Sequence, residues 1–158
     1  MLKLDALMKT GFHITYFPLG EEILSMVRNE NWKGLDESFR ILTSQDGRLL
    51  KFLQNYHDFN SIEYILSIRD AANDWEEDGI WHDDGSRIFA FSLSLTENSL
   101  ELEGGRLGVK NKREEKITLI PTPEFGGIIL FLTGLYGFEH KIHQVTKGRR
   151  IIIAGWCT

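Results

Sequence analysis

The chain lacks residues on which several classes of protein depend. It has 158 residues, with one cysteine, Cys157, and three prolines. A single cysteine forms no intrachain disulfide, so a secreted domain held together by disulfides is excluded. The formal net charge is -5, whereas a nucleic-acid-binding surface needs clustered Lys and Arg to contact phosphates. We therefore expect no nucleic-acid partner.

Long apolar runs are missing as well. The longest, Gly126–Leu132, is far too short to cross a bilayer. Residues 1–20 do not follow the charged, then apolar, then small-residue order of a signal peptide. We expect no membrane partner and a cytoplasmic location. The composition, 42% hydrophobic and 26% charged, is ordinary for a globular protein, and no stretch resembles a linker, so one domain over 1–158 is predicted.

The first part of the chain, 1–77, is predicted to be a helical lead-in with one or two strands. The evidence is apolar residues at helical spacing and a sequence resembling a capping box at Asn60 and Glu63. The expected elements are helices at Gly20–Arg28, at 49–56 and from Asn60 towards Trp75, and a strand at Ser38–Thr43.

The remainder, 78–158, is predicted to be a β core. From Phe89 to Leu95, large apolar residues alternate with Ala and Ser, which is the period of a half-buried strand. Glu103–Gly105 is a turn or bulge signal. Further short apolar segments predict strands at Ile117–Ile120, Gly127–Leu132, His140–Val145 and Arg150–Ile153. Many short strands separated by turns indicate a mainly β sandwich or barrel, with the N-terminal helices packed against it.

The first candidates for chemistry are His82 and Asp84. They are two residues apart, so on an extended segment both side chains point the same way. An imidazole and a carboxylate that converge on one point can bind a divalent metal. By itself this pair is a weak signal, because His-x-Asp occurs often by chance.

Far downstream, His140 and Arg150 extend the set. Two histidines and one carboxylate form the facial triad of non-haem iron oxygenases, which leaves coordination positions open. The guanidinium of Arg150 can bind a carboxylate through two parallel hydrogen bonds, as a bound 2-oxo diacid requires.

With these residues in place, Asp78–Trp156 resembles the prolyl-4-hydroxylase-like branch of the Fe(II)/2-oxoglutarate-dependent oxygenases. That branch shows His-x-Asp, Gly-Gly-x-Leu and an apolar strand ending in Phe. His-x-Val-x-x-Val-x-x-Gly-x-Arg and an aromatic residue follow. The matching positions occur here in the same order: His82 and Asp84, Gly104–Leu107, Gly127–Phe131, and His140, Ile142, Val145, Gly148, Arg150 and Trp156.

The resemblance implies a double-stranded β-helix, or jelly roll. It also implies Fe(II) held by His82, Asp84 and His140, and 2-oxoglutarate held at its far carboxylate by Arg150. Such enzymes use molecular oxygen, convert 2-oxoglutarate to succinate and hydroxylate a carbon, and ascorbate can act as an auxiliary reductant. Since related halogenases replace the ligand carboxylate with a small residue, Asp84 implies hydroxylation. The expected substrate is a peptidyl proline, a free amino acid or a small metabolite.

Three neighbouring residues compete for these roles. The family spacing places the arginine ten residues after the histidine, which favours His140 over His143 and Arg150 over Arg149. Asp83 is adjacent to His82 and would point away from it, towards solvent.

The co-substrate pocket departs from the family pattern. Many relatives add a tyrosine that assists the arginine, but 87–96 contains none. Ser92, Ser94 and Thr133 are candidate substitutes, and so is no substitute at all. Trp156 matches a family aromatic near the co-substrate, and Trp75 and Trp81 could also line the pocket.

Two further alternatives stay open. Arg106 stands where an acidic residue is common, and it is either an ordinary loop residue or a contact to an acidic substrate. The alternative function is a non-catalytic, cupin-like module that binds or senses a metal. Arg150 argues against that module, because a simple metal binder needs no guanidinium beyond the last ligand.

Overall fold

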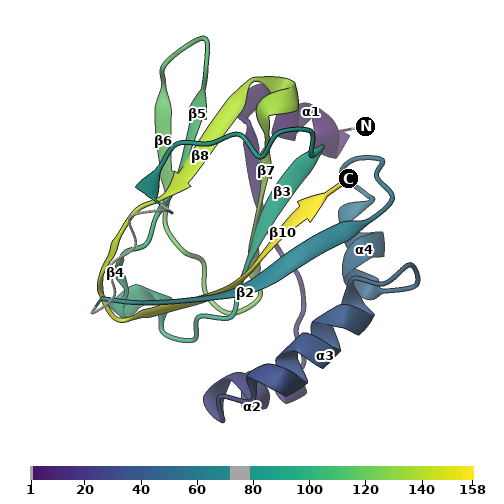
Figure 1. Ribbon diagram of the computed structural model, residues 1–158, viewed down its shortest axis with the longest axis vertical. Helices are drawn as coiled ribbons and strands as arrows, with labels where there is room; N and C mark the ends of the chain where they lie inside the picture. Colours follow the sequence, from purple (N-terminus) through teal and green to yellow (C-terminus); the bar gives the residue numbers. More distant parts are fainter. Residues whose placement is uncertain (1, 72–78) are drawn as a thin grey trace.

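A computed structural model describes residues 2–71 and 79–158 (Figure 1). The first part contains α1 (Leu2–Thr10), β1 (Phe12–Tyr16), α2 (Glu21–Arg28), α3 (Trp32–Leu42), α4 (Arg48–Leu53) and β2 (Ile62–Asp70). The second part contains β3 (Phe89–Ser94), β4 (Glu103–Gly104), β5 (Leu107–Asn111), β6 (Ile117–Ile120), β7 (Gly127–Leu132), β8 (Phe138–Ile142), β9 (Val145–Lys147) and β10 (Arg149–Cys157).

The strands form one large antiparallel sheet facing smaller ones. The large sheet has the order β1-β7-β3-β10-β2, and the smaller sheets are β6-β5-β8 and the pair β4-β9. Figure 1 shows the large sheet on one side and strands β5, β6 and β8 on the other, with the interior of the jelly roll between them. This arrangement confirms the predicted jelly-roll core. Two strands of its large sheet, β1 and β2, come from the first 77 residues.

Helices α2 to α4 pack along the outer side of the large sheet (Figure 1). The Phe39 ring of α3 lies 6.3 Å from the Tyr64 ring of β2. The hydroxyl of Tyr64 donates to the backbone oxygen of Asp36 at 2.9 Å. The Phe59 ring, which follows α4, contacts the Phe89 ring of β3 edge-on at 5.4 Å. Among the described residues, no helix is long and apolar enough to span a membrane.

The predicted helices at Gly20–Arg28 and 49–56 are confirmed by α2 and α4. The prediction of a strand at Ser38–Thr43 is wrong, because that segment forms the end of α3 and its C-cap. Asn31 caps this helix by accepting a hydrogen bond from the Gly34 amide at 3.0 Å. Leu35 and Phe39, one helical turn apart, are both buried on its inner face.

The helix expected from Asn60 is also wrong. Residues 62–70 form β2, which pairs with β10 over nine residue pairs from Ile62–Cys157 to Asp70–Arg149. A local capping sequence is worth about 1 kcal/mol, which is small beside a full ladder of backbone hydrogen bonds in a sheet. Trp75, towards which the helix was expected to run, lies outside the described residues.

Strand β3 was expected to be half-buried, but all six of its residues are buried. Phe89, Phe91 and Leu93 form one face, towards the helices. Gly155 of β10 lies on this side, where an added Cβ would come within 2.2 Å of the Phe91 ring. The other face carries only small side chains, Ala90, Ser92 and Ser94, and it is directed to the interior between the sheets.

Candidate active site

His82 and His140 are brought together by a two-residue β-bridge. The His82 amide donates to the His140 oxygen at 3.1 Å, and the His140 amide donates back at 2.9 Å. The two rings lie 4.3 Å apart, and the His140 ring also packs on Phe131 of β7 at 4.7 Å. Backbone pairing across a long sequence separation therefore sets the spacing of the two imidazoles.

The His82 ring is oriented by the backbone oxygen of Ile80, two residues before it. Its Nδ1 lies 2.9 Å from the Ile80 oxygen, which can only accept a hydrogen bond, so Nδ1 carries the proton. When the imidazole is neutral, as metal binding requires, the lone pair is on Nε2, which faces Asp84. A metal-binding histidine is commonly held in this way, with one nitrogen donating to a carbonyl and the other left to coordinate.

Asp84 completes the cluster from a turn. Its φ is +60°, in the left-handed region, so a turn, and not the alternation of an extended strand, brings it back to His82. One carboxylate oxygen lies 3.4 Å from Nε2 of His82, and the other lies 3.0 Å from Nε2 of His140. The ligand atoms of all three residues lie within 4.8 Å of one another.

This donor set fits a divalent metal. The Oδ2 atom of Asp84 is buried, and no described residue gives it a hydrogen bond of good geometry. Two imidazole nitrogens and a carboxylate on one side of a centre match the 2-His-1-carboxylate set of non-haem Fe(II) sites. The Asp84 side chain is 7% exposed and that of His82 is 45% exposed, so the cluster lies where the interior opens to solvent.

Neighbouring groups keep the Asp84 carboxylate charged. Burial acts to raise its pKa, but His140, the indole of Trp156 and the charge of His82 outweigh burial and hold the pKa below its ordinary value. Arg87 supports the same loop, because it donates to the Asp84 backbone oxygen at 3.2 Å and stacks 5.2 Å over the Trp156 ring. A carboxylate that stays ionised is the form that binds a cation.

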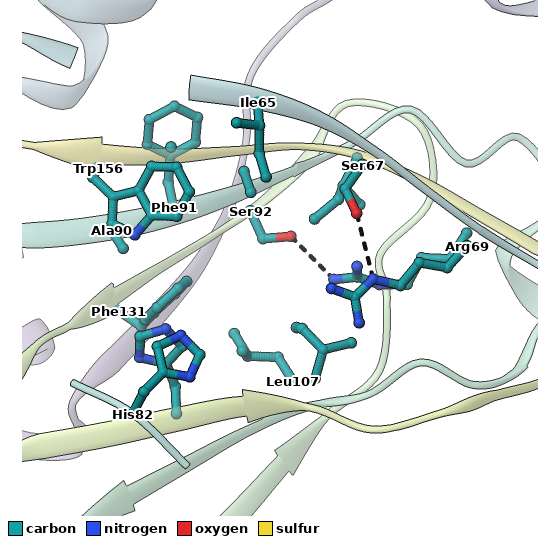
Figure 2. Close-up of a pocket in the computed structure, with 16 residues that line it drawn as sticks. Ile65, Ser67, Arg69, His82, Ala90, Phe91, Ser92, Leu107, Phe131 and Trp156 are labelled. Carbon is teal, nitrogen blue, oxygen red and sulfur yellow. Dashed lines mark hydrogen bonds between the residues drawn. The ribbon is translucent and has the colours of Figure 1, made fainter. Parts of the chain in front are cut away.

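A pocket extends from this cluster across the inner face of the large sheet (Figure 2). Trp156 and Ala90 lie at the end near His82, and Arg69 lies at the other end, with Ser92 and Ser67 between them. Phe131 and Leu107 supply apolar walls. The pocket thus has largely apolar walls, with metal ligands at one end and cationic side chains at the other.

Arg150 is 1% exposed and lines this pocket. Its Nε donates to the hydroxyl of Thr122 at 3.0 Å, and its Nη2 lies 3.5 Å from the hydroxyl of Ser92. Thr122 in turn donates to the Gly105 oxygen at 3.2 Å. Gly105 has a positive φ, and an added Cβ there would come within 2.9 Å of the Arg150 side chain. The absence of a side chain at Gly105 therefore provides the space that the Arg150 side chain occupies.

The competing residues lie elsewhere. Asp83 accepts from Lys112 at 2.6 Å and from the Gly85 amide at 3.0 Å. Arg149 forms ion pairs with Asp70 and Glu30 at 2.8 and 2.7 Å. His143 is absent from the metal cluster formed by the described residues, and its Nε2 faces the outer side of Gly108.

The structure does not bring Ser94, Thr133 or Trp81 into the pocket. The Ser94 hydroxyl accepts from the Thr96 amide. The Thr133 hydroxyl donates to backbone oxygens of Arg87 and Ile88 at 2.5 and 3.3 Å. Trp81 lies outside, beneath the ammonium groups of Lys110 and Lys141. Of the candidate substitutes for the missing tyrosine, Ser92 reaches Arg150.

Three polar residues escaped the sequence analysis: Ser67 and Arg69, which line the pocket, and Thr122, which holds Arg150. Thr122 lies in a loop and carries no motif. Ser67 and Arg69 lie on β2, which was predicted to be a helix. Alternation along 65, 67 and 69, with polar residues at the last two positions, was the signal that could have identified a pocket-facing strand.

Comparison with known proteins also indicates a non-haem Fe(II) site in a jelly-roll fold. The family model of the 2OG-Fe(II) oxygenase superfamily matches residues 51–158. Among solved structures, a prolyl-4-hydroxylase from Pseudomonas putida gives a TM-score of 0.61 at 17% identity, covering 99% of this chain and 94% of that one. A prolyl 4-hydroxylase from Phytophthora capsici gives 0.67 at 13% identity, covering 99% and 61%.

A third structure is the prolyl hydroxylase from Trichoplax adhaerens in complex with a hypoxia inducible factor oxygen degradation domain peptide. It gives a TM-score of 0.59 at 17% identity, covering 99% of this chain and 87% of that one. A comparison with curated proteins found no match. The structural likenesses, all at low identity, establish the fold.

This chain belongs to the 2OG-Fe(II) oxygenase superfamily, since the family model covers most of its length. It is therefore an oxygenase that uses Fe(II) and 2-oxoglutarate, as the resemblance implied. Family membership weighs against the alternative of a non-catalytic metal-binding module.

Proposed function

We propose that this chain is a dioxygenase that hydroxylates a carbon atom, with Fe(II) held by His82, Asp84 and His140. The observation that carries the proposal is the arrangement of one pocket. It has two imidazoles and a carboxylate within 4.8 Å at one end and the buried Arg150 at the other. A five-carbon diacid with a keto group at one end needs such a pair of sites.

We also propose that Arg150 binds the far carboxylate of 2-oxoglutarate. Its guanidinium is held by Thr122 and Ser92, so it is oriented before the ligand arrives, which lowers the entropy cost of binding. The hydroxyls of Thr122 and Ser92 take the place of the tyrosine found in many relatives. Trp156 lines the pocket at the metal end, and its indole helps to lower the pKa of Asp84.

The bound iron and co-substrate supply the oxidation: one oxygen atom of O₂ enters the substrate as hydroxyl, and the other enters succinate as CO₂ is released. The protein contributes positions and a dry environment. Phe131 and Leu107 are buried and give the pocket apolar walls. His82, which is partly exposed, marks the side from which substrate approaches.

For the substrate, we propose a peptidyl proline first, and a free amino acid or small metabolite as alternatives. The support is that structurally similar proteins include prolyl hydroxylases, one of them solved with a peptide. Because ferrous iron persists best under reducing conditions, we propose that the enzyme works in the cytoplasm.

The first test is anaerobic titration with Fe(II) and 2-oxoglutarate. The wild-type chain should develop the weak visible charge-transfer band of the metal–2-oxo acid chelate. His140→Ala should lose it, and the matched variant His143→Ala should keep it. No band in the wild type would exclude the proposed co-substrate site. A band with unchanged 2-oxoglutarate affinity in Arg150→Ala would exclude the role given to Arg150.

The second test is succinate release in air against a panel of prolyl peptides, free amino acids and small carboxylic acids. We expect one class to stimulate succinate formation and to gain 16 mass units per hydroxylation, as the added oxygen atom requires. Stimulation without a hydroxylated product would contradict hydroxylation as the reaction.

A further inference from the structure

The outer face of strands β5 and β8 carries a group of basic and aromatic side chains. His140 lines the interior pocket, so its neighbour Lys141 lies on the outer face, together with Gly108, which is opposite Lys141 in the register. Trp81 packs on Gly108, where an added Cβ would lie 3.0 Å from the indole. The ammonium groups of Lys110 and Lys141 lie 4.7 and 5.3 Å from the centre of the Trp81 ring.

Two further side chains extend this surface. The His143 amide donates to the Arg106 backbone oxygen at 2.9 Å, so these two residues are neighbours across the strands. Burial, and then the charges of Lys141 and Arg106, lower the pKa of His143, so both charges lie within electrostatic reach of the imidazole. We call this surface the basic patch; it consists of Trp81, Arg106, Lys110, Lys141 and His143.

The basic patch carries positive charge that the rest of the fold does not neutralise. Lys110 is paired with Glu139 at 3.1 Å. Within residues 2–71 and 79–158, no carboxylate is paired with Lys141 or Arg106. The chain as a whole has a net charge of -5, so these two cations form a local excess of the opposite sign. Such an excess attracts a partner that carries negative charge.

The basic patch adjoins the metal end of the pocket. Trp81 directly precedes His82, whose side chain is 45% exposed and lines the pocket. His143, which is next to Arg106, comes three residues after His140, and three residues span about 10 Å along a strand. An extended peptide with its reacting residue at the metal therefore reaches the far side of the patch within about three residues.

We infer that the basic patch binds an acidic segment of the substrate, and that the enzyme acts on a peptide with Asp or Glu about three residues from the hydroxylated one. This inference rests on the proposed function and narrows its substrate class to acidic peptides, since a free amino acid is too short to reach the patch. Arg106 and Lys141 bind the carboxylates, and Trp81 offers a flat apolar surface to the peptide. Nucleic acid fits less well, because its binding needs many phosphate contacts and only two cations of the described patch are unpaired.

The test compares labelled peptides that differ only in charge. Each has one proline flanked on both sides by glutamates, by glutamines or by lysines. Binding to the protein loaded with Fe(II) and 2-oxoglutarate is measured by anaerobic fluorescence anisotropy. At about 0.05 M salt, where screening is weak, the wild type should bind the glutamate peptide about 2- to 30-fold more tightly than the glutamine peptide, as two exposed ion pairs allow. The lysine peptide should bind most weakly, and about 0.5 M salt should remove the preference.

The double variant Arg106→Gln, Lys141→Gln should lose the preference for glutamate. Arg106→Lys combined with Lys141→Arg keeps both charges and should retain it. The matched control is Lys33→Gln with Lys51→Gln, which removes the same charge from exposed lysines of α3 and α4. This control should show the wild-type preference. Circular dichroism and the charge-transfer band of the 2-oxoglutarate chelate report the fold and the metal site of each variant.

Four results would overturn the inference. Equal affinity of the wild type for the glutamate and glutamine peptides, with a normal chelate band, would do so and leave the proposed function standing. A preference that survives in Arg106→Gln, Lys141→Gln would place the acid-binding surface elsewhere. Displacement of the glutamate peptide by a short single-stranded oligonucleotide, at lower concentration than by unlabelled glutamate peptide, would make the patch a nucleic-acid site. A wild type without the chelate band would refute the proposed function itself, and with it the role of the patch in binding substrate.

Discussion

The substitution Thr122→Val tests whether Thr122, which the structure places against Arg150, orients this arginine for 2-oxoglutarate. The sequence analysis had instead named Thr133 as a candidate. Thr122 accepts a hydrogen bond from Nε of Arg150 at 3.0 Å and donates one to the Gly105 oxygen at 3.2 Å. Valine keeps the shape of the side chain but removes both bonds. The guanidinium then loses the group that orients it.

The expected loss follows from these two bonds. A hydrogen bond that involves a charged group contributes about 1.5–3 kcal/mol, and about 1.4 kcal/mol corresponds to a tenfold change in Kd. We expect the Kd for 2-oxoglutarate to rise about 10- to 100-fold, with Fe(II) affinity unchanged. The unpaired Gly105 oxygen should also lower the free energy of unfolding by about 1–3 kcal/mol.

Thr133→Val is the matched control. Thr133 was a sequence-based candidate for the co-substrate pocket, but its hydroxyl bonds to the backbone oxygens of Arg87 and Ile88. We expect Thr133→Val to lose a similar amount of stability and to keep its 2-oxoglutarate affinity. The assays are urea unfolding and anaerobic titration of the charge-transfer band at saturating iron. Weaker binding in Thr133→Val, with Thr122→Val unchanged, would refute the reasoning.

Further predictions concern the metal cluster, the adjacent residues Asp83 and Asp84, and the core. His140→Ala should abolish stoichiometric Fe(II) binding, measured anaerobically, and His143→Ala should retain it; the reverse order would reassign the ligand. Asp83→Asn should keep Fe(II) binding and Asp84→Asn should lose most of it, because Asp83 pairs with Lys112 outside the cluster. Lys112 holds the pKa of Asp83 below its ordinary value. The small stabilisation from this pair is therefore present at neutral pH and lost as pH falls through that lowered pKa. The melting temperature of Asp83→Asn should show a weaker fall with acid than that of the wild type, and equal falls would contradict the pairing. Gly155→Ala should cost about 1–3 kcal/mol in urea unfolding by overpacking against Phe91, while a cost near zero would show that the ring moves aside.

Much of the β core was predictable from the sequence. Its short apolar segments are separated by glycines and polar turns, and β3, β6, β7 and β10 lie where the patterns indicated. The spacing of ten residues from His140 to Arg150 also identified a histidine and an arginine that line one pocket. These signals are local. The alternation of a strand and the number of residues between His140 and Arg150 can both be read from a short stretch of sequence.

Prediction failed where a local signal competed with distant pairing. Asn60 and Glu63 resemble a capping box, and isoleucines follow at helical spacing. Nine residue pairs with β10 nevertheless make 62–70 a strand. That error concealed Ser67 and Arg69. Thr122 was missed for a related reason, since nothing in its own loop indicates that a guanidinium from β10 approaches it.

The sequence alone determined which chemical groups are available: two histidines and an aspartate for a metal, and an arginine for a carboxylate. The tertiary structure decided which of them meet. The turn at Asp84, the bridge between His82 and His140, and the pairing of Arg69 with Arg150 all depend on contacts between segments far apart in the chain. Such contacts form because buried backbone groups need hydrogen-bond partners and apolar faces must be buried, and both requirements are met only by the whole fold. No short stretch of sequence specifies its distant partner.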